Sequence, residues 1–429
     1  MYRSFLSAGL LAITLRVGAQ SYVHQVLVLS EGYFDVGANE QVLPPTLGSY
    51  DPTTGTYQTV ATLAGPRFAS DVIVANGSIY VAADDRVYRF DADTYEQLAM
   101  AEVAGVRKLA VWNDLLLITR GELGGLPHYF EARDRNGLAF VQAITPADGL
   151  LFSVEGLLVV DDKAYLAVSN AFDFANLQGR VGIVDLPSMT YASEVDLGAE
   201  GLNPERIMAH DGDVIAFNNK DFTGSSISRV NVAQANLAYT TNVSVNSGCA
   251  ASVRVASNNK VYFMEYAQNE LARFDLNTAT VSDTLAGSPA VYGMIEDPIN
   301  NVLYATTTDY FSSGDLHVMS LEGAVLSTVA TSVSPGNMAL DIRTTTGIST
   351  RTANRIGLYP NPATDRITVS GALPSGNSVI SVTNALGAEV LRLQRNVSTQ
   401  GATLDISSLS TGVYSLRLNN GEAVHFIKP

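Results

Sequence analysis

Asp71-Val-Ile-Val-Ala-Asn-Gly, Ile79-Tyr-Val-Ala and Arg86-Val-Tyr-Arg-Phe-Asp are three consecutive apolar segments, and a fourth runs from Tyr95 to Val103. The turns between them carry Asn-Gly, Asp-Asp and Asp-Ala-Asp-Thr, which reverse the chain at low steric cost. Short apolar segments separated by such turns are typical of antiparallel strands. This stretch therefore predicts a unit of four strands, which we name A to D in chain order.

The four-strand pattern recurs along most of the chain. Its spacing is roughly 36 to 50 residues, which is the range of the blades of a β-propeller. Six complete units are expected from about residue 69 to 331. The other strands A begin at Lys108-Leu-Ala-Val-Trp-Asn-Asp, Gly156-Leu-Leu-Val-Val-Asp-Asp, Arg206-Ile-Met-Ala-His-Asp-Gly, Ser252-Val-Arg-Val-Ala and Tyr292-Gly-Met-Ile-Glu.

The two ends of this region complement each other. Residues 25–30, 48–51 and 57–63 supply strands B, C and D without a strand A, whereas residues 337–342 resemble a strand A without a strand B. Joined, they would form a seventh blade and remove the open edges of the ring. We predict an all-β fold: a seven-bladed β-propeller over residues 20–343, closed by both chain ends. A β-sandwich and a six-bladed ring are the alternatives.

The N-terminus has the pattern of a signal peptide over residues 1–19. Arg3 precedes an apolar stretch, and Val17-Gly18-Ala19 is a small-residue cleavage site. No cysteine follows the apolar stretch, so we expect no lipid anchor. Cys249 is the one cysteine, which excludes an intrachain disulfide. The formal charge of −16 argues against nucleic acid and anionic lipid as partners.

Residues 344–355 contain few apolar side chains and predict a linker. A second all-β unit follows over residues 356–429, and its alternating pattern suggests a small Ig-like sandwich. Its expected strands are residues 366–370, 378–383, 389–393, 403–406, 412–418 and 423–427.

Three ordered motifs in this unit carry a family resemblance: Leu358-Tyr-Pro-Asn-Pro-Ala-Thr-Asp, Val382-Thr-Asn-Ala-Leu-Gly-Ala-Glu-Val and Leu404-Asp-Ile-Ser-Ser-Leu-Ser-Thr-Gly-Val-Tyr, and the basic end Val424-His-Phe-Ile-Lys-Pro also fits. They resemble the type A C-terminal sorting domain of the type IX secretion system of Bacteroidota. The resemblance implies export to the periplasm and then across the outer membrane. It also implies that a surface sortase removes the domain and leaves the protein attached to the cell surface or secreted.

The B–C connections combine acidic, amide and aromatic side chains, and in a propeller they all emerge on one face. Such side chains can hold a flat or amphipathic small molecule through apolar contact and a few polar contacts. The alternative is that each ring only seals the gap between adjacent blades. The predicted ligand-binding residues are Tyr33, Phe34, Asp35, Tyr129, Phe172, Asp173, Phe174, Asp221, Phe222, Glu265, Tyr266, Asp309, Tyr310 and Phe311.

The propeller region carries a second resemblance. Leu27-Val-Leu-Ser-Glu-Gly-Tyr-Phe and Gly48-Ser-Tyr-Asp-Pro-Thr-Thr-Gly are similar to the opening of the YncE-like, DUF5074 class of Bacteroidota surface propellers. Some members of that class bind corrinoids and pass them to a TonB-dependent outer-membrane transporter. The resemblance therefore implies a corrinoid such as cobalamin as ligand and a transporter as partner. Those members are lipoproteins, whereas this sequence has no lipid-bearing cysteine.

Signals for catalysis are weak. The five histidines fall on different units with no metal-ligand spacing, and no phosphate loop, Gly-x-Ser-x-Gly or calcium loop occurs. We therefore expect no enzyme, no metal and no cofactor, and we expect a monomeric protein that binds a corrinoid, a glycan or a similar ligand. A module that contacts proteins or matrix is one alternative, and a hydrolase or lactonase is another.

Overall fold

A computed structural model describes residues 20–221, 223–246, 253–255, 257–345, 357–370, 376–385, 387–397, 402–418 and 423–429. The chain divides into two compact units, with the boundary after Thr345. The predicted signal peptide lies outside the described residues, and so do residues 346–355 of the predicted linker. Thr344 and Thr345, which we expected in the linker, belong to the last strand of the first unit.

The described part of the first unit forms seven four-stranded antiparallel sheets and one two-stranded hairpin. From the first strand to the fourth, three sheets are β30 (Pro335–Thr345), β1 (Gln20–Ser30), β4 (Thr46–Asp51), β5 (Thr56–Thr62); β6 (Asp71–Ala75), β7 (Ser78–Ala83), β8 (Arg86–Asp91), β9 (Gln97–Glu102); and β10 (Val106–Trp112), β11 (Leu115–Arg120), β12 (Phe130–Asp134), β13 (Phe140–Ile144). The hairpin is β2 (Tyr33–Asp35) and β3 (Glu40–Leu43).

The other four sheets continue the same strand order. They are β14 (Val154–Val160), β15 (Lys163–Val168), β16 (Arg180–Asp185), β17 (Thr190–Asp196); β18 (Pro204–His210), β19 (Asp213–Asn218), β20 (Ser225–Asn231), β21 (Asn236–Val243); β22 (Val253–Val255), β23 (Lys260–Glu265), β24 (Glu270–Asp275), β25 (Thr280–Leu285); and β26 (Gly293–Asp297), β27 (Val302–Thr307), β28 (Ser313–Ser320), β29 (Val325–Val333). Two short 3₁₀ helices, η1 (Pro146–Asp148) and η2 (Ala199–Gly201), lie between sheets.

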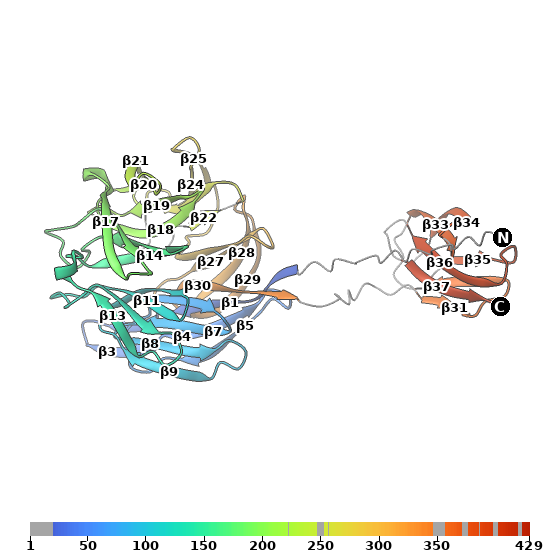
Figure 1. The fold of residues 1–429 in the computed structure, drawn as a ribbon, viewed down its shortest axis with the longest axis horizontal. Coiled ribbons are helices and arrows are strands. Elements are labelled where there is room, and N and C mark those ends of the chain that lie inside the picture. Colours follow the sequence, from blue (N-terminus) through green and yellow to red (C-terminus); the bar gives the residue numbers. More distant parts are fainter. Residues whose placement is uncertain are drawn as a thin grey trace, which may run out of the picture. The chain divides into compact units, whose positions relative to one another are not determined.

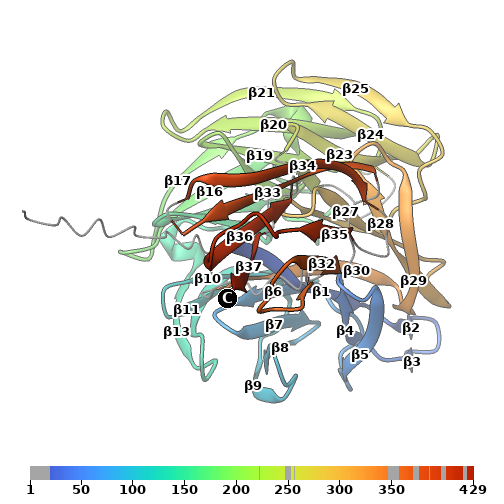
Figure 2. The same cartoon turned by 90° about the vertical axis from the view of Figure 1, so that its right-hand side faces the viewer.

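The sheets are arranged around a common centre, with strands β5, β9, β13, β17, β21, β25 and β29 at the outer rim (Figure 2). The second strands of the sheets are almost fully buried, whereas these fourth strands are largely exposed. Each apolar cluster of the described residues in this unit joins two neighbouring sheets, and one of them joins the last sheet to the first. Radial four-stranded sheets packed face to face in this way define a β-propeller.

Tight turns connect the first and second strands, as the Asn-Gly and Asp-Asp pairs indicated. Asn76, Asn113, Asp161 and Asp211 adopt φ values of 51°, 51°, 52° and 49°. Asn and Asp tolerate this left-handed conformation better than other non-glycine residues, and it suits the twist of a short hairpin. The face that carries these turns therefore offers short loops with few side chains.

The two ends of the unit pair in one sheet. Strand β1 pairs with β30 in antiparallel register, with Val26 opposite Leu340 and Val28 opposite Met338. On its other edge β1 pairs with β4. The expected contact between residues 25–30 and 337–342 is therefore present, and the first sheet combines strands from both ends of the unit.

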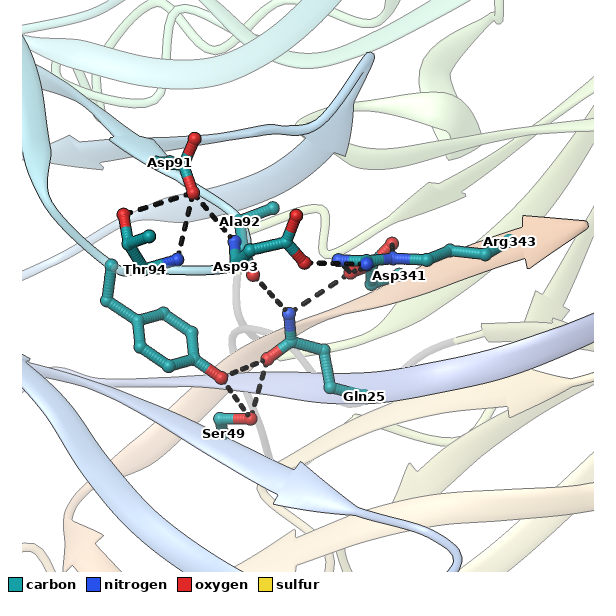
Figure 3. A network of polar contacts seen from close by, with 9 residues as sticks. Gln25, Ser49, Asp91, Ala92, Asp93, Thr94, Asp341 and Arg343 are labelled. Carbon is teal, nitrogen blue, oxygen red and sulfur yellow. Dashed lines mark hydrogen bonds and ion pairs between the residues drawn. The ribbon is translucent and has the colours of Figure 1, made fainter.

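We call the sheet β30-β1-β4-β5 the closing sheet. The buried side-chain amide of Gln25 joins it to the β6–β9 sheet (Figure 3). The Gln25 Nε2 donates to the Ala92 carbonyl oxygen at 2.8 Å and to Asp341 Oδ2 at 3.0 Å. Its Oε1 accepts hydrogen bonds from Ser49 Oγ at 2.6 Å and from Tyr95 OH at 2.8 Å. One side chain of β1 thus contacts β4, β30 and the turn between β8 and β9.

The second unit forms two sheets that share one core (Figure 1). One contains β31 (Gly357–Tyr359), β32 (Arg366–Ser370) and β35 (Ala402–Asp405), and the other contains β34 (Glu389–Val397), β33 (Gly376–Asn384), β36 (Gly412–Leu418) and β37 (Ala423–Lys428). Ile367 and Leu404 from the first sheet pack with Val382 and Phe426 from the second. The predicted strands all occur, and β31 is an additional one.

Candidate functional site

One face of the propeller carries both the B–C loops and the beginnings of the innermost strands. This follows from the antiparallel order of each sheet, in which the second strand ends where the first strand begins. We call this end the B–C face. Its described loops are residues 31–45, 84–85, 121–129, 169–179, 219–221 with 223–224, 266–269 and 308–312.

A cavity of about 170 Å³ lies where the innermost strands begin. We call it the shaft cavity. Charged side chains dominate its lining, together with two aromatic rings and an amide: Glu31, Phe68, Arg107, Lys108, Glu155, Glu205, Arg206, Tyr292 and Asn337.

The charged residues of the shaft cavity occupy equivalent places in the repeat. Arg107, Glu155 and Glu205 are the second residues of β10, β14 and β18, and Lys108 and Arg206 are third residues. They are not among the predicted ligand-binding residues. A charge at the same position of several otherwise apolar innermost strands is the signal that would have found them, because few charges are buried without a specific partner.

Two of the cations have acidic partners. Arg107 Nε and Nη2 donate to the two carboxylate oxygens of Glu155 at 2.7 and 2.9 Å. Burial of Glu155 opposes its ionisation, but the Arg107 guanidinium outweighs this and lowers the pKa of that carboxyl. Lys108 Nζ donates to the Ser70 carbonyl oxygen at 2.6 Å and lies 3.6 Å from Asp71 Oδ1. Burial lowers the pKa of Lys108 to about 8.

Two carboxyls of the shaft cavity are held differently. Burial raises the pKa of Glu31, whose Oε1 accepts a hydrogen bond from the Tyr292 hydroxyl at 2.7 Å. Burial also raises the pKa of Glu205 to about 7, although Asn219 donates a hydrogen bond to it. The strongest polar contacts of these two acids are thus with uncharged groups.

An aromatic hollow of about 450 Å³ adjoins the shaft cavity. Glu31 and Phe68 line both spaces. The hollow lies between the β2–β3 hairpin and the 308–312 loop, which belong to neighbouring sheets. Its other lining residues are Gly32, Tyr33, Phe34, Val36, Asn39, Arg67, Tyr310 and Ser334.

Edge-to-face contacts set the orientation of the rings around the hollow. Tyr33 and Phe311 are 5.2 Å apart between ring centroids, with an interplanar angle of 80°. Tyr310 and Tyr292 are 5.3 Å apart at 84°. Tyr292 therefore connects the aromatic hollow to Glu31 in the shaft cavity.

The structure brings four of the predicted ligand-binding residues together: Tyr33, Phe34, Tyr310 and Phe311. Phe172 lies on another loop, with the Arg107 guanidinium carbon 5.5 Å from its ring centroid. Gly121 makes this packing feasible, because a Cβ there would lie 2.5 Å from the Phe172 ring. Phe172 thus supports a wall of the shaft cavity.

Other predicted aromatic residues are placed apart from this group. Tyr129 is half-buried and packs on the apolar cluster between the β10–β13 and β14–β17 sheets, so it acts as a ring between blades. Phe174 and Tyr266 are 69% and 66% exposed on the B–C face. Phe222 lies outside the described residues.

Most of the predicted acidic residues shape their own loops. Asp309 Oδ1 accepts hydrogen bonds from the backbone N–H groups of Phe311 and Ser312 at 2.9 and 2.7 Å, and these bonds lower the pKa of Asp309 to about 2. Backbone N–H groups of the same turn likewise donate hydrogen bonds to the carboxylates of Asp35, Asp221 and Glu265. Asp173 is exposed. Four of the five predicted acids therefore have a local role in their own turns, and their contact with a ligand stays a prediction.

No group of three or more His, Cys, Asp or Glu side chains in the described part of the chain has the arrangement of a metal site. The described segments also contain no helix long and apolar enough to cross a membrane.

The arrangement of the first unit and its structural relatives define the class as a β-propeller. A protein of unknown function from Desulfotomaculum acetoxidans matches 74% of this chain and 98% of its own at 12% identity, with a TM-score of 0.54. A quinonprotein alcohol dehydrogenase-like protein from Bacteroides thetaiotaomicron matches 75% and 79% at 17% identity, with a TM-score of 0.53. Hydrazine synthase from Kuenenia stuttgartiensis matches 65% and 90% at 12% identity, with a TM-score of 0.53. At these identities the likeness shows the fold alone.

The second unit carries a family match. Residues 357–428 match the model of the secretion system C-terminal sorting domain. This confirms the predicted type IX sorting domain and supports secretion of the chain and its attachment to the cell surface. No curated protein sequence matches the chain.

Proposed function

We propose that the propeller is a cell-surface binding protein for a small amphipathic ligand, and that it does not catalyse a reaction. The observation that carries the proposal is the junction of the aromatic hollow with the charged shaft cavity at Glu31 and Phe68. Small-molecule sites in proteins combine an apolar, aromatic wall with a few placed polar groups, in cavities of about 300 to 1,000 Å³. The hollow supplies the wall and the shaft cavity supplies the polar groups.

We also propose a seven-bladed ring and an Ig-like fold for the sorting domain. The pairing of β1 with β30 and the apolar cluster between the last and first sheets support a closed ring. The shared core of the two small sheets supports a sandwich. A closed ring matters for function because it holds the B–C loops of the first and last sheets side by side, where the hollow forms.

A corrinoid and a glycan are the finer candidates for the ligand. The resemblance of residues 27–34 and 48–55 to YncE-like, DUF5074 propellers favours a corrinoid and, with it, an outer-membrane transporter as partner. The hollow of about 450 Å³ would enclose only part of such a large molecule. Calorimetric titration of the protein with cyanocobalamin and with neutral oligosaccharides distinguishes the two.

Fluorescence titration with the uncharged dye N-phenyl-1-naphthylamine tests whether the hollow binds amphipathic molecules. We expect saturable enhancement with the wild-type protein and at least a fivefold weaker affinity for Tyr33→Ala, because the edge contact with Phe311 is lost. Tyr266→Ala is the matched control, since Tyr266 lies on the same face outside the lining of the hollow. Absence of dye binding, or equal loss in both variants, would refute the proposal.

One further observation favours a protein partner as a second candidate function. The most exposed large apolar side chains of the described residues lie on B–C loops of five different sheets: Val36 (83%), Leu123 (69%), Phe174 (69%), Tyr266 (66%) and Phe311 (63%). Contiguous exposed apolar patches mark protein interaction surfaces, and exposed side chains from several loops of one face can contribute to such a patch. This placement supports a partner that covers the B–C face.

Photo-cross-linking in the secreting cell tests this second function. Cross-linking groups at positions 174 and 266 should capture the same protein, whereas a group at position 77, in a turn between a first and a second strand, should not. Different products from positions 174 and 266 would contradict a single partner on the B–C face.

A further inference from the structure

The carboxyls of the shaft cavity differ in their ion-pair partners. Arg107 is paired with Glu155, and Lys108 lies beside Asp71, which is outside the lining. The Arg206 Nη2 is 3.5 Å from Asn337 Oδ1. The lining thus holds three cations and three carboxyls, and among the described residues Glu31 and Glu205 have no cation within ion-pair distance.

Glu31 occupies the point at which the shaft cavity meets the aromatic hollow. In the described residues no cation lies within ion-pair distance of its carboxyl, and Tyr292 supplies the hydrogen bond to it. Gly336 lets the carboxyl lie close to β30, because a Cβ at that position would be 2.5 Å from Glu31 Oε1. Burial raises the pKa of Glu31, and this effect outweighs the hydrogen bond from Tyr292 and the attraction of Lys108, Arg107 and Arg206, which lower the pKa from a greater distance.

The hollow beside Glu31 is suited to a positive charge. The rings of Phe68 and Tyr310 line it, and aromatic faces attract cations. The Arg67 guanidinium carbon already lies over the Phe68 ring, 5.5 Å from its centroid, so Tyr310 is the ring left for a ligand cation. Arg67 also lines the hollow, but its guanidinium is bonded to Asp84, with Nε 2.9 Å from Oδ2. A cation that enters the hollow would therefore meet Glu31 and aromatic rings rather than an uncompensated guanidinium.

We infer that the ligand is an organic cation, with a protonated amine that contacts Glu31 and an apolar ring or chain that lies in the aromatic hollow. The inference rests on the proposed binding of a small amphipathic ligand and is an alternative to the corrinoid and the glycan. The amine supplies the ion-pair partner that Glu31 lacks among the described residues, and the ring fills the hollow. A ligand with a carboxylate at the same place would add a second negative charge beside Glu31.

Isothermal titration calorimetry of the full chain with three matched probes tests the inference. Phenethylamine, 2-phenylethanol and 3-phenylpropanoate share a phenyl ring and differ in the charge at the end of a short chain. We expect phenethylamine to bind at least tenfold more tightly than the other two. Glu31→Gln should abolish this preference and leave the affinity for 2-phenylethanol unchanged.

One control variant guards against a trivial outcome. Glu102→Gln changes an exposed carboxyl on β9 and should retain the preference for the amine. Equal affinity for all probes, tighter binding of 3-phenylpropanoate, or no binding of phenethylamine to a protein that binds the naphthylamine dye would overturn the inference and leave the proposed function standing. If neither the naphthylamine dye nor phenethylamine binds, the inference and the proposed function are both overturned.

Discussion

Replacement of Gln25 by leucine tests whether the buried amide holds the closing sheet to its neighbour. Leucine has a similar volume, so the change removes four hydrogen bonds with little cavity (Figure 3). Asp341 keeps its contact with Arg343 at 2.7 Å, and Ser49 and Tyr95 remain 3.2 Å apart. The Ala92 carbonyl oxygen loses its donor. Because a net hydrogen bond contributes about 0.5–1.5 kcal/mol and a buried orphan costs about 1–3 kcal/mol, we expect a loss of about 3 kcal/mol.

Urea unfolding followed by tryptophan fluorescence measures this loss. Trp112 is the one tryptophan in the sequence and lies in β10, so its signal reports on the propeller. Gln58→Leu, on the exposed strand β5 of the same sheet, is the matched control and should change the free energy of unfolding by less than about 0.5 kcal/mol. Equal effects of the two substitutions would show that the Gln25 contacts do not hold the closure.

Three further outcomes are expected. Gly336→Ala should weaken phenethylamine binding at least tenfold in calorimetry, because the new Cβ displaces the Glu31 carboxyl; an unchanged affinity would contradict this. Glu205 keeps its proton up to about pH 7 in the folded chain, compared with about 4.5 when unfolded, so the free energy of unfolding should fall as pH rises between these values. Glu205→Gln should therefore stabilise the protein at pH 8 by on the order of 1–2 kcal/mol in urea titrations, and not at pH 4; a gain equal at both pH values would refute this. Phe172→Ala should cost about 1–2 kcal/mol in the same assay, whereas Phe174→Ala, on the same loop but exposed, should cost little; equal losses would contradict the different packing of the two rings.

The repeating strands could be predicted because their signals are local. Asn76-Gly77 and Asp211-Gly212 mark hairpins in the sequence, and these residues adopt the positive φ angles that such turns require. The pairing of the chain ends was also accessible, because one end lacked a strand A and the other supplied one. The extension of β30 to Thr345 was not, because it depends on pairing with Gln20 at the far end of β1.

The candidate site was only partly predictable. The aromatic residues of loops 31–45 and 308–312 could be named from the sequence, although the sequence does not show that these two loops adjoin. The local bonds of the acids beside them could not, because an Asp in a loop accepts hydrogen bonds from nearby backbone N–H groups only when the turn is formed. Asp309 shows this with two such bonds.

The charges of the shaft cavity were missed because each one alone is an ordinary surface residue in sequence. Only the alignment of β10, β14 and β18 reveals that Arg107, Glu155 and Glu205 share one position. A charge at that position is unexpected, because the rest of an innermost strand is largely apolar. Buried ion pairs also contribute less to stability than apolar packing of the same volume. Departures of this kind from local rules concentrate at functional sites. The shaft cavity, where three innermost strands place a charge at the same position, is therefore the part of the propeller in which we propose that a ligand is held.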